Sequence, residues 1–507
     1  MKSKKLSLRP NPGVWLIVIL AFFLLGYKLD KPFYGHHDWN GVFFGNVARN
    51  TARLGFLRTK FGALRSFLPA DEGDFSFYTH YPPVFHLLLG LEASLFGVKE
   101  WLMRLLSIAF SLLAVYLIYK IGQIIFNQRT ALLGGLFLVL TPMFLYFAKM
   151  PIHEVYGLPL VAFSFYRYFL FCQAKEEEDK KKAFKYLLIA LIFAHQTVWS
   201  AYYLTPLFIF HHWLLIKKKD RRLFLLLLVP LFSFLSHLIH TFILTSSWSN
   251  NLFATMFFRM QIGRRAAKFQ FGLIEYLKKE TLWLTVYFTR MVCLLAFFYL
   301  LVLVGRLVRD QIRPKDGYLL LLVIFPFIDP IIFRNVCFIH DYKLYYFLLS
   351  LPLLASAGLL FLEEKLNFLW RGKRLISLAG LVIIFIIFST ERLEFTKTLL
   401  HSEMNKPAHD LGLILQKEAK KGEVVLLGSP SFGQFLDLFL NFYGERKVVY
   451  FEPKLENFLE VNSSRVGLVV FPAGREEPEP ALMNFLENNY SSFEKGDFLF
   501  FDLGEKK

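Results

Sequence analysis

Three acidic residues, each directly preceded by a histidine, could supply acid–base chemistry: Asp38, Glu154 and Asp341. A carboxylate shielded from bulk water can take the proton from a hydroxyl nucleophile. Together with an imidazole it can also hold a divalent cation that neutralises a phosphate. Each residue taken alone is equally well explained as an ordinary solvated loop residue. The recurrence of the pair on one side of the predicted membrane favours chemistry.

Basic residues form a second group of candidates. Arginine contacts phosphate in a bidentate manner and lysine acts as a point charge, so a cluster of both suits a phosphorylated substrate. The alternative interpretation is that these basic residues anchor the protein to lipid headgroups. The cluster lies in segment 246–281, at Arg259, Arg264, Arg265, Lys268, Lys278 and Lys279, and Arg290 lies a few residues into the predicted span 282–305.

The composition indicates a membrane protein that crosses the bilayer many times. The chain has 507 residues, of which 55% are hydrophobic and 19% charged, and it contains repeated apolar runs long enough to cross a bilayer. A net charge of +18 would suggest nucleic-acid binding in a soluble protein. Here it indicates cytoplasmic loops rich in Lys and Arg, so no nucleic-acid partner is expected. We therefore predict a polytopic α-helical membrane protein.

The apolar runs predict about eleven spans. The run at 84–97 is too short for a span and is expected to be a re-entrant or interfacial helix. Basic residues before the first span and at Lys217–Arg222 place the N-terminus in the cytoplasm and the three His/acid pairs outside. The predicted spans are 14–29, 101–125, 130–148, 155–173, 184–199, 201–216, 223–245, 282–305, 317–333, 344–362 and 375–389.

The composition changes near residue 390. Short apolar runs at 424–427, 447–451, 466–471 and 498–502 predict buried strands, and helical patterns occupy 405–420, 431–443 and 480–489. This alternation predicts a small α/β domain. We therefore expect a transmembrane domain at 1–390 and a soluble extracytoplasmic domain at 391–507. The three cysteines are far apart in sequence and predict neither a metal site nor a disulfide framework.

Several motifs, in their order along the chain, resemble the C-type glycosyltransferase superfamily, in the branch of protein O-mannosyltransferases and aminoarabinose–lipid A transferases. The chain departs from the family at His153-Glu154, where Asp is frequent, and at His195-Gln196, where Lys is frequent. The motifs that carry the resemblance are Gly35-His-His-Asp38, Ala48-Arg-Asn50, Tyr78-Thr-His-Tyr-Pro-Pro83, Met150-Pro-Ile-His-Glu154 and Ile339-His-Asp-Tyr342.

The resemblance implies an inverting glycosyltransferase of the plasma or inner membrane. It would move a sugar from a polyprenyl-phosphate donor to a hydroxyl of a lipid, glycan or protein on the outer face, with Asp38 as general base and Glu154 as a second catalytic residue. A divalent ion held by Asp38, His153 and Glu154 is a further hypothesis, and no other cofactor is expected. The expected substrate-binding residues are His37, Arg49, His80, His153, Arg259, Arg264, Arg265, Lys268, Arg290, His340, Asp341 and Tyr342.

Two other functions fit the same sequence. A transporter or flippase of a lipid-linked sugar would also need a cavity and cations for the phosphate. Transporters usually show internal repeats and charged residues near the bilayer midplane, whereas this chain has no visible repeat and its His/acid pairs lie at the outer edge. A structural membrane protein with a partner-binding C-terminal domain is the third alternative.

Overall fold

The protein consists of two compact units. The computed structural model describes residues 11–67, 75–216, 220–263, 271–311, 313–369, 379–380, 383–384, 386–388, 390–428, 436–461, 466–472 and 478–506. The helical unit comprises the described parts of 1–30, 79–85 and 101–400, and the mixed unit those of 31–78, 86–100 and 401–507. Contacts therefore group the first loop with the C-terminal segment, which a division at residue 390 does not anticipate. The domain boundary itself stays a prediction.

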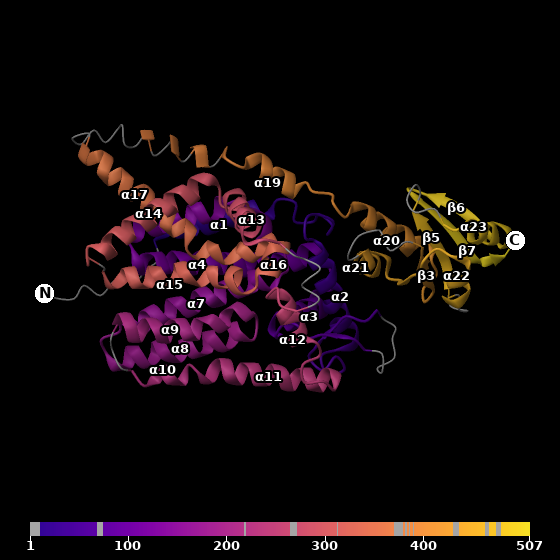
Figure 1. Cartoon of the computed structure of the whole chain (residues 1–507), viewed down its shortest axis with the longest axis horizontal. Helices are drawn as coiled ribbons and strands as arrows, with labels where there is room; N and C mark the ends of the chain where they lie inside the picture. Colours follow the sequence, from indigo (N-terminus) through magenta and orange to yellow (C-terminus); the bar gives the residue numbers. More distant parts are fainter. Residues whose placement is uncertain are drawn as a thin grey trace. The chain divides into compact units, whose positions relative to one another are not determined.

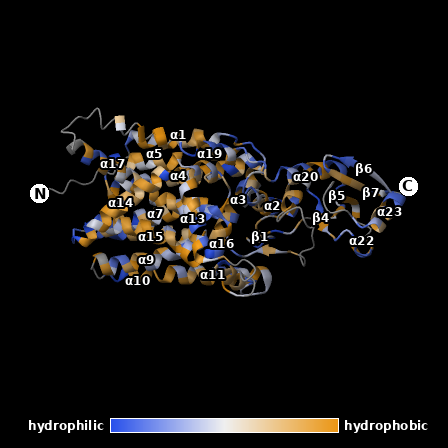
Figure 2. Ribbon diagram, turned by 45° about the horizontal axis from the view of Figure 1, so that its top comes forward, coloured by the Kyte–Doolittle hydropathy of each residue, from blue (hydrophilic) through white to orange (hydrophobic). Residues whose placement is uncertain are grey.

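The helical unit is built from helices that lie side by side, as Figure 1 shows for α4, α7 and α15. Figure 2 shows that most of these helices are apolar along their length. Their bounds are α1 (Pro12–Gly26), α4 (Glu100–Ile125), α5 (Gln128–Leu140), α6 (Pro142–Phe147), α7 (His153–Gln173), α8 (Glu177–His195), η2 (Trp199–Tyr203), α9 (Leu204–His211), η3 (His212–Ile216), α10 (Arg222–Leu225), α11 (Leu228–Thr245), α12 (Leu252–Arg259), α13 (Leu273–Tyr287), α14 (Arg290–Val308), α15 (Pro314–Ile332), α16 (Arg334–Ile339), η5 (Asp341–Leu349), α17 (Leu351–Leu369) and α19 (Leu393–Leu400).

Four helices of the described residues are long and apolar enough to cross a membrane. They are Glu100–Ile125, His153–Gln173, Arg222–Thr245 and Arg290–Val308, and a fifth span is formed if η5 and α17, bent by 51°, count as one. Three of these helices coincide with predicted spans. The fourth, Arg290–Val308, overlaps the predicted span 282–305, whose first residues belong to α13, because Thr289 has a positive φ of +67 and its side chain caps a new helix at Arg290. The polytopic helical class is confirmed. The total of about eleven spans stays a prediction, since the predicted span 375–389 falls largely outside the described residues.

Some predicted spans are broken rather than continuous. The run 130–148 is two helices, because Thr141 has an extended backbone and its side chain caps α6 at the amide of Phe144. Pro142 then occupies the first position of α6, where its missing N–H removes no helical hydrogen bond. The run 201–216 is likewise divided among η2, α9 and η3. The sequence did not predict these breaks.

The mixed unit contains a five-stranded sheet with strand order β4-β3-β5-β7-β6. Strands β4, β3 and β5 are parallel, whereas β7 is antiparallel to β5 and β6. The bounds in this unit are α2 (Trp39–Leu54), β1 (Ala63–Leu64), β2 (Phe77–Tyr78), α3 (Val84–Phe96), α20 (Lys406–Glu418), β3 (Val424–Leu427), α21 (Leu436–Phe439), η6 (Leu440–Gly444), β4 (Lys447–Tyr450), α22 (Leu455–Val461), β5 (Val466–Pro472), α23 (Pro480–Asn489), β6 (Tyr490–Lys495) and β7 (Phe498–Lys506).

Helices cover both faces of this sheet (Figure 1). Successive residues of a strand point to opposite faces, so Val425 and Leu427 pack on one side with Leu411 of α20. Leu426 packs on the other side with Phe458 of α22 and residues of α23. Strands β3, β4, β5 and β7 lie where the sequence predicts strands.

Candidate active site

Glu154 lies in the first turn of α7 because the preceding backbone is extended at Ile152 and the helix begins at His153. Pro151 favours a break before this helix, since Met150, the residue before the proline, is biased away from helical geometry. The positive end of the helix dipole stabilises a carboxylate at this position. Glu154 is nevertheless only 4% exposed, so its charge also needs a partner inside the protein.

That partner is Lys343, the third residue of η5. Its Nζ donates to Oε1 of Glu154 in a buried ion pair. The same ammonium donates to the hydroxyl of Tyr81 at 2.9 Å. Tyr81 in turn stacks on the ring of His153, with ring centroids 3.8 Å apart. Residues from three distant segments are thereby joined around one lysine.

A second buried carboxylate, Asp329, lies in α15 between two prolines. Its Oδ2 accepts from the hydroxyl of Ser200 at 2.5 Å, and its Oδ1 accepts from the hydroxyl of Tyr203 at 2.9 Å. Both donors belong to η2. Two neutral hydroxyls thus stabilise this carboxylate without cancelling its charge.

Residues 79–85, which carry the Tyr-Pro-Pro motif, are held by hydrogen bonds to their backbone. The indole Nε1 of Trp199 donates to the carbonyl of His80 at 2.7 Å. Nε2 of His237 lies 3.1 Å from the carbonyl of Thr79. The two prolines lack backbone N–H groups, so these external contacts fix the segment and with it the position of Tyr81.

Tyr81, Glu154, Asp329 and Lys343 line one cavity of about 240 Å³ within the helical unit, together with residues of η2. The cations at its wall are Lys343 and Arg259, and the guanidinium of Arg259 lies 5.2 Å from the centroid of the Tyr81 ring. Most of the remaining wall is aromatic or aliphatic. A cavity with a few placed charges in an apolar wall is typical of a site for an amphipathic ligand. The full lining is Tyr81, Glu154, Val198, Trp199, Ser200, Tyr202, Tyr203, Phe234, Leu252, Phe253, Thr255, Met256, Arg259, Asp329, Phe333, Val336 and Lys343.

Asp38 belongs to the mixed unit, at the N-cap position of α2. Its side chain does not cap the helix. Instead Oδ2 accepts from the backbone N–H of Gly35 at 2.6 Å, so the carboxylate is turned back onto its own loop. Asp38 is 7% exposed. A partly shielded carboxylate in a fixed orientation is suited to serve as a general base.

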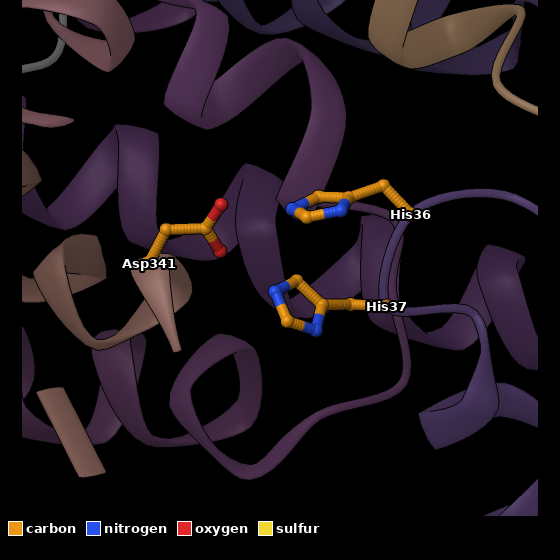
Figure 3. A group of neighbouring side chains, drawn as sticks. All are labelled: His36, His37 and Asp341. Atoms are coloured by element: carbon orange, nitrogen blue, oxygen red, sulfur yellow. The ribbon is translucent and has the colours of Figure 1, made fainter. Parts of the chain in front are cut away.

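The histidines before Asp38 lie side by side. Figure 3 shows the rings of His36 and His37, whose centroids are 4.1 Å apart. His37 has a left-handed backbone with φ +58, and its Nδ1 accepts from the indole of Trp39 at 3.2 Å. Non-glycine residues in this region carry strain that is common at functional sites. Asp341, also drawn in Figure 3, belongs to the helical unit, where its carboxylate accepts from the hydroxyl of Tyr287.

The structure brings some predicted site residues together. Glu154 and Arg259 line the cavity, and His153 contacts its wall through Tyr81. Nε2 of His80 lies 3.3 Å from the hydroxyl of Thr255, another lining residue. His340 and Tyr342 stack with ring centroids 5.2 Å apart.

Other predicted residues lie elsewhere. The side chain of Arg290 is exposed and does not line the cavity. Arg49, His37 and Asp38 belong to the mixed unit. Arg264, Arg265 and Lys268 lie outside the described residues. The sequence analysis missed Lys343, although it directly follows the singled-out Asp341-Tyr342 pair, because its partner Glu154 is 189 positions away.

The contacts of Glu154 and His153 bear on the hypothesis that Asp38, His153 and Glu154 hold a divalent metal ion. The ammonium of Lys343 already neutralises Glu154, and a divalent cation beside it would meet like-charge repulsion. His153 is packed between the rings of Tyr81 and Phe85. Glu154 therefore fits an ion pair better than a metal ligand, and a metal ion held with Asp38 stays a prediction.

Part of the sequence matches a family model, and the fold matches solved structures. Residues 80–246 match the family model described as dolichyl-phosphate-mannose-protein mannosyltransferase. The fold is similar to that of ArnT from Cupriavidus metallidurans bound to undecaprenyl phosphate, with a TM-score of 0.64, 15% identity, and coverage of 96% of this chain and 97% of that one. The chain has the fold of the C-type glycosyltransferases. The resemblance stated from the sequence motifs is thereby confirmed.

Two further structures extend this comparison. The oligosaccharyltransferase of Archaeoglobus fulgidus, in complex with Zn and sulfate, matches with a TM-score of 0.59 and 12% identity over 95% of this chain and 71% of that one. The arabinofuranosyltransferase AftD from Mycobacteria matches with a TM-score of 0.54 and 12% identity over 97% of this chain and 40% of that one. No curated protein matches the sequence. At these identities the similarity establishes the fold, and the chemistry must be argued from the site.

Proposed function

We propose that the protein is a membrane glycosyltransferase that moves a sugar from a polyprenyl-phosphate donor to an acceptor hydroxyl on the outer face of the membrane. The observation that carries the proposal is the cavity in which Lys343 and Arg259 flank Tyr81 within a largely apolar wall. A lipid-linked sugar phosphate has the matching parts, because its phosphate needs cations and its isoprenoid chain needs an apolar surface.

The proposed reaction is a single displacement with inversion. The acceptor oxygen forms a bond to the anomeric carbon while the bond from that carbon to the donor phosphate breaks. Asp38 takes the proton of the acceptor hydroxyl, and the polyprenyl phosphate leaves with the electron pair of the broken bond. Lys343 and Arg259 stabilise the charge that develops on this leaving group.

Glu154 acts on Lys343 in this proposal. Because the ion pair and the Tyr81 hydroxyl fix the ammonium, little side-chain entropy remains to be lost when a phosphate binds. Asp329, held by Ser200 and Tyr203, is the candidate for contacting the hydroxyls of the sugar. Its carboxylate is negative, whereas the groups proposed to bind the phosphate are positive. Arg264, Arg265 and Lys268 are proposed to add positive charge for the phosphate.

The proposed placement follows the charge rule applied to the sequence. The N-terminus lies in the cytoplasm of a plasma or inner membrane, about eleven spans follow, and the C-terminal domain lies outside. The acceptor is a membrane lipid, a glycan or a protein. Reporter fusions test this orientation, and a reporter that is active outside the cell when fused at 217–222 would contradict it.

The decisive experiment compares the purified parent protein with Asp38→Asn, both checked for folding. The assay measures release of polyprenyl phosphate from a panel of lipid-linked sugars in the presence of lipid, glycan and peptide acceptors. We expect turnover by the parent and a loss of about 100-fold or more in the variant, the scale of a positioned general base. A parent that binds the donors and moves them across a vesicle membrane without cleaving them would instead establish a transporter.

A further inference from the structure

The loop that carries Asp38 is held by residues of the C-terminal segment. Asn405 lies 370 positions after Gly35, yet its side-chain Nδ2 donates to the carbonyl of Gly35 at 2.9 Å. The backbone N–H of Asn405 donates to the carbonyl of Tyr34 at 2.8 Å. One residue therefore binds two consecutive carbonyls of the loop.

These contacts lead directly to the carboxylate of Asp38. Gly35 receives the hydrogen bond from Asn405 at its carbonyl, and its own N–H donates to Oδ2 of Asp38 at 2.6 Å. The carbonyl of Gly35 also accepts from the backbone N–H of Asp38 at 3.2 Å. The peptide groups on both sides of Gly35 are thus fixed, and they fix the orientation of the carboxylate. Losing the Asn405 amide would release one end of this chain of bonds.

A second anchor lies next to the first. The hydroxyl of Tyr443 accepts from the backbone N–H of Phe33 at 2.7 Å and donates to Oε1 of Glu100 at 3.1 Å. Burial, together with the negative charge of Glu100, raises the pKa of Tyr443, so the phenol keeps its proton. The ring of Tyr443 packs edge-on against His409, which also contacts Tyr34. The C-terminal segment therefore holds the loop before and after Tyr34.

The helix that follows Asp38 is fixed by the same segment. The guanidinium of Arg49 donates to the carbonyl of Phe442 at 2.9 Å and lies 4.6 Å from the centroid of that ring. Gly45 lies against the Phe442 ring so closely that a Cβ there would be 2.5 Å from it. The loop and the helix on either side of Asp38 are therefore held by Asn405, Phe442 and Tyr443.

We propose that Asn405 is a positioning residue that sets the orientation of the Asp38 carboxylate, so that the C-terminal segment fixes the geometry of the proposed general base. This inference rests on the proposed function, in which Asp38 is the general base. It assigns a catalytic purpose to the C-terminal residues, which the sequence patterns alone leave without one.

The test uses the full-length protein and three substitutions. Asn405→Asp keeps the shape of the side chain but removes the amide donor, and Asn405→Ala removes both acceptor and donor. Asn489→Ala is the matched control, because the Asn489 side chain also donates to a backbone carbonyl, that of Phe485 at 2.7 Å, within α23. Each substitution is made in the parent and in an Asp38→Asn background.

We expect both Asn405 variants to lose about 10- to 100-fold in kcat, the scale of a misplaced catalytic group, with the KM for the lipid-linked donor changed by less than about threefold. In the Asp38→Asn background, measured by long incubation with labelled donor, the same substitutions should change kcat by no more than about twofold. Groups that act as one unit give such non-additive losses. The Asn489→Ala control should behave as the parent does.

Two results of the activity assay would overturn the inference. One is an equal loss for Asn405 variants in both backgrounds, which would indicate general destabilisation. The other is a loss in the Asn489→Ala control as large as that of the Asn405 variants. Amide hydrogen exchange of residues 33–40 separates this inference from the proposed function. If the parent transfers no sugar but Asn405→Asp still accelerates exchange there, only the proposed function fails; unchanged exchange refutes the positioning role as well.

Discussion

Lys343 donates to the carboxylate of Glu154 from 189 positions further along the chain, and both side chains are buried. Two buried charges that depend on each other are costly to separate, because the remaining partner is left uncompensated. The same ammonium reaches the hydroxyl of Tyr81, so this pair combines stability with the placement of a cation at the cavity. The two roles can be separated by mutation.

We expect Lys343→Met and Glu154→Gln each to destabilise the protein by about 3–5 kcal/mol, since each leaves one buried charge unpaired. The double variant removes both charges and should recover most of that loss. Thermal unfolding in detergent measures the stability. Donor binding gives the second readout: the double variant should stay at least about tenfold weaker than the parent, because the cation for the phosphate is absent.

A double variant no more stable than the single variants would contradict the coupling between these two residues. A double variant that binds donor as tightly as the parent would show that Lys343 does not bind the donor phosphate. Lys365→Met is a suitable control, because this lysine on α17 does not line the cavity.

The neighbouring tyrosines Tyr202 and Tyr203 provide a matched comparison. The hydroxyl of Tyr203 donates to Asp329, whereas the buried hydroxyl of Tyr202 has no hydrogen-bond partner among the described residues. Tyr203→Phe should therefore cost roughly 1.5–3 kcal/mol, the range for a hydrogen bond to a charged group. Tyr202→Phe should be neutral or slightly stabilising. Equal effects of the two substitutions on unfolding would show that the hydrogen bond to Asp329 contributes no stability.

The sequence predicted the helices and strands that are defined by a continuous run of apolar residues. The apolar runs at 101–125 and 155–173 correspond closely to α4 and α7, because length and hydrophobicity alone define a helix of that kind. Strand β6 (Tyr490–Lys495) was not predicted, since its mostly polar residues carry no apolar run and it lies at the edge of the sheet.

The site was predictable only in part, for a physical reason. Glu154 stood out because a histidine directly precedes it, and Arg259 because it belongs to a basic cluster suited to phosphate; both line the cavity. The roles of Lys343 and Tyr203 could not be predicted from the sequence, because each depends on a partner that only folding brings near. These partners are Glu154 for Lys343 and Asp329 for Tyr203. The contact of Asn405 with Gly35 is of the same kind. Residue type suggests which groups can do chemistry, but pairing across the chain decides which of them are placed to do so.

The mixed unit should lose stability in acid through Glu445. Burial raises the pKa of this carboxyl, but the hydrogen bond from Arg53 at 2.7 Å and the charges of Arg49 and Arg53 outweigh it and hold the pKa below its usual value of 4.5. A lowered folded-state pKa means that the stabilisation is present above the unfolded-state value and is lost as the pH falls towards the folded-state value. The contribution is at most about 1 kcal/mol, because the pair is partly exposed.

Thermal unfolding of the parent and of Glu445→Gln between pH 7 and pH 3.5 checks this prediction. The melting temperatures should differ above about pH 5.5 and converge as the pH falls below 4.5, where Glu445 becomes protonated in the parent as well. Glu452→Gln serves as the control, since its ion pair with Lys454 is on the surface. A difference that stays constant with pH would contradict the assigned role of the Glu445 charge.

Close packing of α14 against α17 depends on Gly358. A Cβ at this position would collide with the backbone carbonyl of Leu295, an atom that cannot move without shifting α14, whereas a Cβ at Gly305 of α14 would meet nothing within 4 Å. Small residues allow such close approach between helices in a membrane. Gly358→Ala should therefore destabilise the protein by about 1–3 kcal/mol through overpacking. Gly305→Ala should be neutral or slightly stabilising, because alanine favours the helix more than glycine does. Unfolding in a detergent titration measures both, and a Gly358→Ala variant as stable as Gly305→Ala would contradict the close contact of the two helices.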